Sequence, residues 1–210
     1  MESARDPLVR RAHRDAGMVV PDGMPLVWLL RRAGHRETQR VYGPDLMLAV
    51  FARAQAAGWR HYLYGSSPDV LRRLEANLRR RFPGALIAGA YAPPFRPPGA
   101  AEEDRVIAEI DGSGADILWV GLSTPKQELW MTQHRSRLRT PVLVGVGAAF
   151  DFHAGLLRQA PPVVQKLGLE WAFRLAMEPR RLFGRYARIV PGFLALLVAE
   201  KLGWRRLRDR

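Results

Sequence analysis

The sequence predicts an α/β fold: a Rossmann-like parallel sheet flanked by helices, followed by a C-terminal helical appendage that associates with a membrane. Two observations predict the sheet and one predicts the appendage. Short apolar stretches alternate with helical stretches of about 10 to 15 residues, which is typical of parallel strands joined by helical crossovers. Each strand also ends in a small or polar turn. From Pro161 onward the pattern becomes helical only.

Five short stretches rich in apolar and aromatic residues predict strands at 17–20, 61–64, 86–90, 117–120 and 142–146. Stretches with helical spacing predict helices at 6–15, 25–34, 44–57, 68–82 and 102–112. Ser67 followed by Pro68 predicts a polar cap with proline at the first helical position. The proline-rich stretch 91–100 predicts a loop that is mobile or lies over a site.

The stretch 116–130 combines a buried strand with a ligand-binding turn. Ile117 to Val120 is wholly apolar, and a turn of small residues leads to Pro125. We expect Pro125 at the first helical position, Ser123 or Thr124 as the cap, and a capping box closed by Glu128. Ligands of parallel sheets bind at this end of a strand. Lys126 and Gln127 would then face a ligand, although an ordinary turn with two solvated side chains fits as well.

The composition points to an anionic partner. The 210 residues carry a formal net charge of +13 with 48% hydrophobic residues and no cysteine. The absence of cysteine excludes disulfides and cysteine-ligated metals. The positive net charge favours a nucleic acid, a lipid surface or a phosphorylated substrate as the partner. From Arg158 to the end, twelve Lys and Arg stand against four Asp and Glu. The positive charge is therefore concentrated in the appendage.

Four residues outside that stretch are candidates for chemistry. Asp22 follows the predicted strand 17–20, where a carboxylate can act as a general base, although Asp-Gly is also common in turns. Asp151 follows the last strand, where acidic residues often accept hydrogen bonds from a ribose or nucleobase. His153 is a second acid/base candidate, but a lone histidine is more often structural. Arg40 lies in a polar loop and is otherwise a solvated charge.

The appendage combines arginines with apolar runs. Arg174, Arg180, Arg181 and Arg185 recur at roughly helical spacing, and guanidinium groups bind diphosphates through paired hydrogen bonds. A solvated face or lipid headgroup contact would use them equally well. The apolar run 189–199 is too short to span a bilayer, which needs about 20 residues. We expect an interfacial helix, with a helix packed on the domain as the alternative.

Several patterns are missing from the sequence. It contains no Gly-x-Gly-x-x-Gly after a strand, no P-loop and no Gly-x-Ser-x-Gly. The first absence argues against a nicotinamide-dependent oxidoreductase. No Asp-x-Asp is present either, which disfavours a divalent metal at a nucleotide-sugar site. We therefore expect no cofactor and no metal.

Taken together, the segments resemble the WecG/TagA/CpsF family of bacterial glycosyltransferases. The matching segments are Val-Pro-Asp-Gly-Met-Pro at 20–25, Gln-Arg-Val-Tyr-Gly-Pro-Asp-Leu at 39–46, Tyr-Leu-Tyr-Gly-Ser at 62–66, Val-Gly-Leu-Ser-Thr-Pro-Lys-Gln-Glu at 120–128, Val-Gly-Val-Gly-Ala-Ala-Phe-Asp-Phe-His-Ala-Gly at 144–155, Ala-Pro at 160–161, Gly-Leu-Glu-Trp-Ala-Phe-Arg-Leu at 168–175 and Glu-Pro-Arg-Arg at 178–181. Their order and spacing match from about residue 5 to 190.

The resemblance implies inverting transfer of a sugar from a UDP-sugar to a polyprenyl-diphosphate-linked sugar. It places the protein in the cytoplasm, peripheral on the inner face of the plasma membrane, in cell-surface polysaccharide biosynthesis. Asp22 looks like the general base. Arg40, Gln127 and Asp151 look like nucleotide-sugar contacts, with Lys126 a less certain one, and the four appendage arginines look like partners of the diphosphate.

The resemblance also implies a division of the chain. Residues 1–157 would form the catalytic α/β domain and 158–210 the basic amphipathic appendage. Family members usually begin with a strand ending in Thr-x-Asn, and this chain begins after it. A misassigned start, a truncated chain and an incomplete site are the three explanations. Ser123 stands where glycine is usual, and Gln159 where arginine is usual. The apolar helices of the appendage could pair between two copies of the chain, so a homo-oligomer is also compatible with the sequence.

A non-enzymatic basic module remains the alternative function. It would bind nucleic acid or an anionic membrane through the C-terminal arginines, with a steep dependence of affinity on salt. The sequence shows no recognition-helix motif and no strand of surface aromatic residues. We therefore expect no nucleic-acid partner. The sugar transferred and its acceptor cannot be predicted from these residues.

Overall fold

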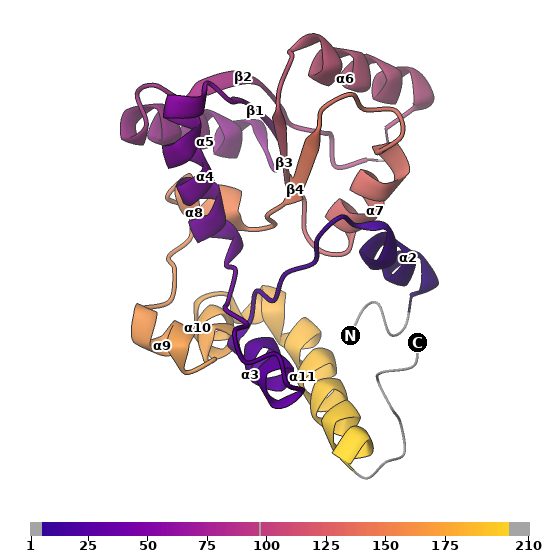
Figure 1. Ribbon diagram of the computed structural model, residues 1–210, viewed down its shortest axis with the longest axis vertical. Helices are drawn as coiled ribbons and strands as arrows, with labels where there is room; N and C mark the ends of the chain where they lie inside the picture. Colours follow the sequence, from indigo (N-terminus) through magenta and orange to yellow (C-terminus); the bar gives the residue numbers. More distant parts are fainter. Residues whose placement is uncertain (1–5, 97, 202–210) are drawn as a thin grey trace. The chain divides into compact units, whose positions relative to one another are not determined.

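The structure is a computed structural model that describes residues 6–96 and 98–201, apart from seven side chains in the last helix (Figure 1). Contacts divide the chain into two compact bodies. The first spans Leu8–Gln159 and contains the sheet. The second runs from Ala160 onward and takes in Asp6 and Pro7 at the other end of the chain. Each body is described by itself.

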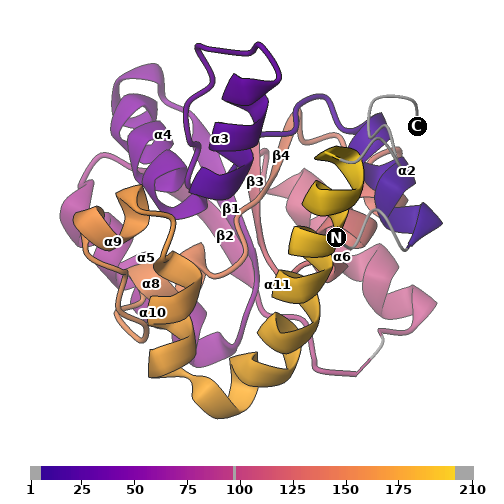
Figure 2. The same ribbon diagram turned by 90° about the horizontal axis from the view of Figure 1, so that it is seen from below.

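The first body is built on a sheet of four parallel strands. These are β1 (Arg60–Gly65), β2 (Leu86–Tyr91), β3 (Ile117–Gly121) and β4 (Val142–Gly145). Their order in the sheet is β2-β1-β3-β4, so β1 and β3 lie in the centre (Figure 2). The predicted α/β fold with a parallel sheet flanked by helices is therefore confirmed.

Helices cover both faces of this sheet (Figure 1). The helices of the first body are α2 (Pro7–Asp15, whose first residue groups with the second body), α3 (Met24–Arg32), α4 (Gly43–Ala57), α5 (Pro68–Arg81), α6 (Ala100–Gly112), α7 (Lys126–His134) and α8 (Ala149–His153). Apolar residues of α4, α5 and α8 form one core with the sheet, and those of α6 and α7 form the other. Each core buries a separate face of the strands.

The predicted strand at 17–20 is wrong. Residues 17–20 form no strand or helix, and Met18 is 82% exposed and Val19 61% exposed. A strand buries such residues against neighbours in a sheet, and these have none in the sheet of the first body. Two apolar valines in a row therefore misled the prediction, because local composition cannot reveal whether a pairing partner exists.

The predicted start of the helix at Pro125 is also wrong by one position. Pro125 occupies the N-cap of α7, with φ −92° and ψ 5°, and no side chain caps the helix. Glu128 instead accepts a hydrogen bond from the hydroxyl of Thr124 (2.9 Å). Thr124 and Glu128 thus meet side chain to side chain. In the first turn the N–H of Gln127 donates to the backbone oxygen of Ser123 at 3.3 Å, in place of a side-chain cap.

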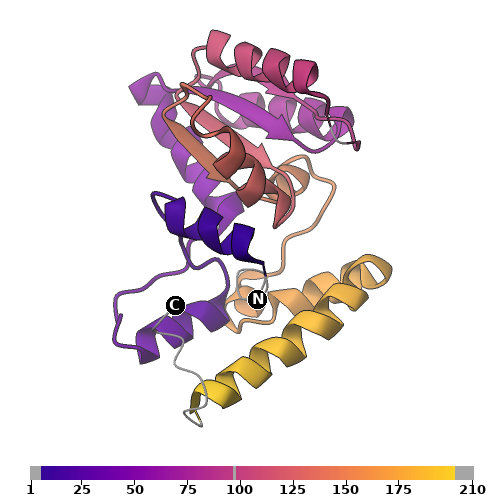
Figure 3. The ribbon, with the colours of Figure 1, turned by 90° about the vertical axis from the view of Figure 1, so that its right-hand side faces the viewer.

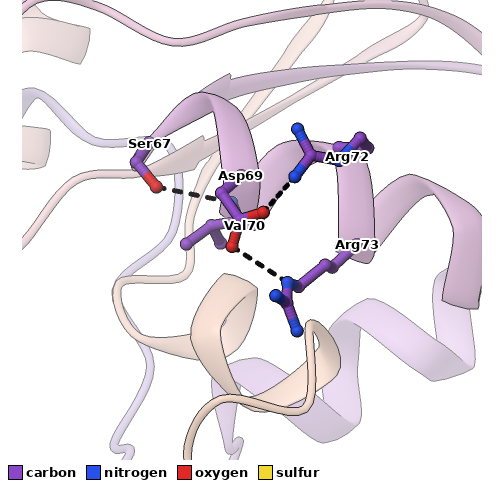
Figure 4. Close-up of polar contacts among 5 residues, drawn as sticks. All are labelled: Ser67, Asp69, Val70, Arg72 and Arg73. Carbon is purple, nitrogen blue, oxygen red and sulfur yellow. Dashed lines mark hydrogen bonds and ion pairs between the residues drawn. The ribbon is translucent and has the colours of Figure 1, made fainter.

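The predicted cap of α5 is confirmed. Ser67 is the N-cap and its hydroxyl accepts a hydrogen bond from the N–H of Val70 at 3.3 Å, with proline in the first turn (Figure 4). In the same turn Asp69 accepts from Arg72 and, at 2.9 Å, from Nε of Arg73. Such exposed ion pairs contribute little to stability, so the cap is the stronger determinant of where α5 begins.

We expect Ser67→Ala to lower the free energy of unfolding by about 1 kcal/mol, because Val70 N–H loses its acceptor. Urea denaturation followed by circular dichroism would measure the change. Ser67→Asp serves as the control, since its carboxylate accepts the same bond and should retain wild-type stability. A Ser67→Ala protein as stable as the wild type would show that water replaces the cap without cost.

A buried histidine lies at the start of the central strand. His61 is fully buried, its Nδ1 accepts a hydrogen bond from Nε1–H of Trp119 (3.1 Å), and its ring stacks on Phe51 with the centroids 3.9 Å apart. Burial lowers the pKa of His61 to about 4. The imidazole is therefore neutral in the folded protein at neutral pH, with Nδ1 as the unprotonated nitrogen.

We expect stability to fall as the pH decreases from about 6.5 to about 4. The unfolded chain takes up a proton at His61 near its ordinary pKa of 6.5, whereas the folded chain does so only near 4. The contribution of the neutral His61 to the free energy of unfolding is thus complete above pH 6.5. It falls by about 3 kcal/mol as the pH decreases from 6.5 to 4. Urea unfolding at several pH values would measure it. His61→Leu should flatten the dependence even though it weakens the fold by orphaning Trp119, and an unchanged slope would refute the assignment.

The second body is helical. It contains α9 (Pro162–Lys166), α10 (Glu170–Met177) and α11 (Pro179–Lys201). Gly168, at φ 68°, separates α9 from α10 within the stretch expected to be helical throughout. α10 ends before Glu178, α11 begins at Pro179, and α11 continues through Pro191. Among the described residues, no helix combines the length and the apolar character that a membrane span requires.

Candidate active site

The carboxyl ends of β1 and β3 lie where the crevice of an open parallel sheet is expected. The chain leaves β1 for β2 on one side of the sheet and leaves β3 for β4 on the other. Ligands of open parallel sheets bind where neighbouring connections diverge in this way. The turns after β1 and β3 begin at Gly65 and Gly121, which are paired in register. Among the described strands, these two ends are therefore the expected place for a substrate.

Two glycines let the backbones meet at these strand ends. Gly65 has φ +129°, and a Cβ added to it would lie 2.6 Å from the carbonyl oxygen of Gly121. A Cβ on Gly121 would lie 2.4 Å from the buried ring of Phe150. Ser66 follows with φ 59°, a backbone conformation that residues other than glycine rarely adopt. Close backbone approach and local strain are frequent at binding sites.

Asp22 and Arg40 form a direct pair. Nε of Arg40 donates a hydrogen bond to the backbone oxygen of Asp22, and its Nη2 lies 3.7 Å from the carboxylate. The Asp22 side chain is 66% exposed and that of Arg40 only 14%. Asp22 precedes the N-cap Gly23 of α3 and does not follow a strand as predicted. Arg40 therefore fixes the main chain of Asp22 while the carboxylate stays accessible to a substrate.

Tyr42 connects this pair to α8. The Arg40 guanidinium lies 4.1 Å from the centroid of the Tyr42 ring, and that ring is 6.4 Å from the ring of Phe152. Phe152 neighbours Asp151, which is half-buried on α8. A chain of contacts thus runs from Asp22 to the helix that carries Asp151. Sequence reasoning treated Arg40 as a loop residue and missed Tyr42 as its support.

Gln127 ties the turns after β3 and β4 together. Its side chain is buried, its Oε1 accepts a hydrogen bond from Gly147 N–H (2.9 Å), and its Nε2 donates to Glu128 (3.2 Å). Gly147 has φ +53°, so a residue with a side chain would be strained there. Both hydrogen-bonding ends of the Gln127 amide are thus engaged within the protein. Lys126, by contrast, is exposed at the start of α7.

His153 belongs to the packing of α8. Its Nε2–H donates to the backbone oxygen of Pro44 at 2.9 Å, and its own backbone oxygen accepts from the amide of Asn77 at 2.8 Å. Burial is the main cause that lowers the pKa of His153. The structure thus favours the structural reading of this histidine, since it joins α8 to α4 and α5 and its ring proton is committed to a backbone oxygen.

A stack of aromatic rings lies under the proline-rich loop. Tyr91, Tyr64, Trp130 and His134 stack in series, with neighbouring centroids 6.0, 4.2 and 4.6 Å apart. Burial raises the pKa of the Tyr64 phenol well above its ordinary value, so it stays neutral. Pro93, Pro94 and Pro98 of the loop line the remaining cavity, which holds about 10 Å³. A cavity of that size accommodates one water at most.

A larger groove of about 610 Å³ opens beside α5 and the edge strand β2. It is lined by Leu71, Arg72, Arg79 and Tyr91, among others, and by none of the predicted site residues. This groove therefore does not bring the predicted site residues together.

The predicted arginines belong to the second body. Arg174 lies on α10, half-buried, and Arg180 is exposed in the first turn of α11. The side chains of Arg181 and Arg185 lie outside what the structure describes. Within the described residues, no group of three or more His, Asp or Glu side chains is placed to hold a metal ion.

The first body thus supplies an exposed carboxylate held beside a guanidinium, and two strand ends whose backbones approach closely where a crevice is expected. A carboxylate in this setting can accept a proton from a hydroxyl, and such a crevice can take a nucleotide. The comparison with known families agrees with this chemistry. The chain is matched from residue 1 to residue 207 by the model of the glycosyl transferase WecG/TagA/CpsF family.

Proposed function

Since the chain belongs to the WecG/TagA/CpsF family, whose members are glycosyltransferases of cell-surface polysaccharide synthesis, we propose that it transfers a sugar from a UDP-sugar to a polyprenyl-diphosphate-linked sugar. Transfer inverts the anomeric centre. The observation that carries the proposal is Asp22, whose carboxylate is 66% exposed while its main chain is held by Arg40.

The proposed reaction is a single displacement. Asp22 accepts the proton of the acceptor hydroxyl as the hydroxyl oxygen bonds to the anomeric carbon of the donor. The bond from that carbon to the diphosphate oxygen breaks, and UDP leaves with the electron pair. Positive charge placed at the leaving oxygen lowers the barrier. Arg174, Arg180, Arg181 and Arg185 supply that charge in the proposal, without a metal.

The remaining residues bind the donor in this proposal. Arg40, Lys126 and Asp151 contact the nucleotide-sugar, with Asp151 near the uracil, and Gln127 supports the site. Gln127 acts through the Gly147 turn that it holds, because both ends of its amide are already bonded. The second body, with exposed apolar residues such as Phe183 and Leu194, contacts the inner face of the plasma membrane.

The test is a transfer assay with the full chain. Candidate UDP-sugars would be mixed with a lipid-linked sugar acceptor in anionic vesicles, and both UDP release and glycosylated lipid would be measured, with and without a chelator. We expect equimolar UDP and product with one donor, unaffected by the chelator. Absence of product with every UDP-sugar, while a sugar linked to another nucleotide is accepted, would overturn the proposed donor class.

A further inference from the structure

The residues from Pro21 to Val41 form a loop that is closed at its base. The N–H of Val41 donates to the backbone oxygen of Pro21 at 2.9 Å, and Arg40 donates to the backbone oxygen of Asp22. We call this segment the 21–41 loop. Its base therefore carries the proposed general base, and its body carries α3.

The helix in this loop is apolar on all sides. Five consecutive residues, Leu26 to Leu30, are apolar, yet only Val27 among them is buried. Leu26 is 47% exposed and Trp28, on the opposite side of the helix, is 43% exposed. Helices with this composition are normally covered by other apolar groups.

The described elements of the first body provide little of that cover. Among the described elements of Leu8–Gln159, none packs extensively against α3. Figure 3 shows α3 set apart from the sheet and the helices that flank it. The exposed Met18, Val19 and Val20 extend the apolar surface to the other side of Asp22. Two exposed apolar stretches therefore flank the proposed general base.

The charges of the loop are complementary to an anionic surface. Arg31 and Arg32 end α3 and Arg36 follows, all exposed, and the single carboxylate between residues 23 and 39 is that of Glu37. Exposed leucines and a tryptophan followed by arginines are typical of a helix that lies at a membrane surface.

We infer that α3 and residues Met18 to Val20 dock onto an anionic lipid surface and constitute a membrane contact separate from the C-terminal body. Leu26 and Leu30, one turn apart on the same face of α3, enter the boundary between headgroups and acyl chains, and the three arginines contact lipid phosphates. If the proposed function holds, docking presents Asp22 at the height of a lipid-linked acceptor sugar. The docking itself rests only on α3 and residues 18–20.

The first experiment follows a label on the loop. The chain has no cysteine, so Leu26→Cys introduces one site for an environment-sensitive fluorophore. Leu86→Cys is the matched control, because Leu86 is 48% exposed at the start of β2, the opposite end of the sheet from the crevice. With vesicles of phosphatidylcholine and phosphatidylglycerol, we expect a blue shift and shielding from an aqueous quencher at position 26 and none at 86.

The second experiment measures partitioning into the same vesicles. Leu26→Ser with Leu30→Ser should weaken binding by about 10- to 100-fold, as expected for the removal of two inserted apolar side chains. Leu86→Ser with Trp59→Ser is the control, since Leu86 is 48% exposed and Leu26 47%, and Trp59 is 40% exposed and Leu30 37%. Thermal unfolding would establish that both variants fold.

Three results would overturn the inference. They are equal partitioning of the two double variants, a label at position 26 that stays accessible on bound protein, and shielding of that label before vesicles are added. The last would mean that a second copy or the chain's own C-terminal body covers α3. Because these experiments contain no sugar nucleotide, a failure of sugar transfer would leave the docking result standing. Loss of docking would equally leave the reaction of a short-chain soluble acceptor unchanged.

Discussion

Asp22→Asn is expected to lower the rate of sugar transfer by about 10²- to 10⁴-fold, the range for removal of a general acid or base. Asparagine has nearly the same shape but cannot take up the proton of the acceptor hydroxyl. Arg40 bonds to the backbone oxygen of Asp22, so its hold on the loop does not depend on the carboxylate that is removed. The loss should therefore appear in catalysis and leave folding intact.

Asp104→Asn is the matched control for this variant. Asp104 also pairs with an arginine, Arg137, and its side chain is 66% exposed, as is that of Asp22. Initial rates of UDP release and thermal unfolding curves would be recorded for both variants. We expect unchanged unfolding in each and a loss of rate in Asp22→Asn alone. Full transfer activity in Asp22→Asn would show that another group accepts the proton.

Gly65→Ala is expected to destabilise the protein by about 3 to 5 kcal/mol, through overpacking and backbone strain together. The added methyl would lie 2.6 Å from a backbone oxygen of Gly121, and the φ of +129° is itself unfavourable for alanine. Since backbone atoms cannot rotate away as a side chain does, the carboxyl ends of β1 and β3 would have to separate. Urea denaturation would measure the loss.

Two further glycines make this prediction specific. Gly112→Ala meets no atom within 4 Å and lies at the end of α6, so it should be neutral or slightly stabilising. Gly121→Ala meets the ring of Phe150 at 2.4 Å, and Phe150→Leu in the same chain should restore part of the stability. If Gly65→Ala were as stable as Gly112→Ala, the close approach of the two strand ends would be wrong.

Much of the sheet could be predicted from the sequence because its strands are buried. The runs that became β1 and β3 are apolar on both faces, and buried parallel strands have this pattern. The same reasoning failed at Met18 to Val20, where apolar residues are exposed and unpaired. Composition reports that a segment prefers an apolar environment, but it does not say whether that environment is a sheet.

The candidate site could be predicted only in part. Asp22 and Arg40 were both singled out, yet their contact depends on a loop closure that no local pattern encodes. Gln127 was expected to face a ligand, whereas its amide joins two turns that are distant in the sequence. Gly65 and Gly121 were missed as a pair, because their requirement for glycine arises from a register between strands. Local motifs identify residue types, and tertiary pairing determines what they contact.

The position of Asp22 depends on closure of the 21–41 loop, and closing the loop costs conformational entropy. Arg40 and Asp22 are 18 positions apart, and bringing them together orders the residues between them. This cost is met by a few hydrogen bonds at the base and not by a packed core, so the loop is a unit that can open while the sheet remains folded. The accessible general base then lies in a segment that can open independently of the sheet. A surface that binds α3 would stabilise the closed form and the active arrangement of Asp22 together.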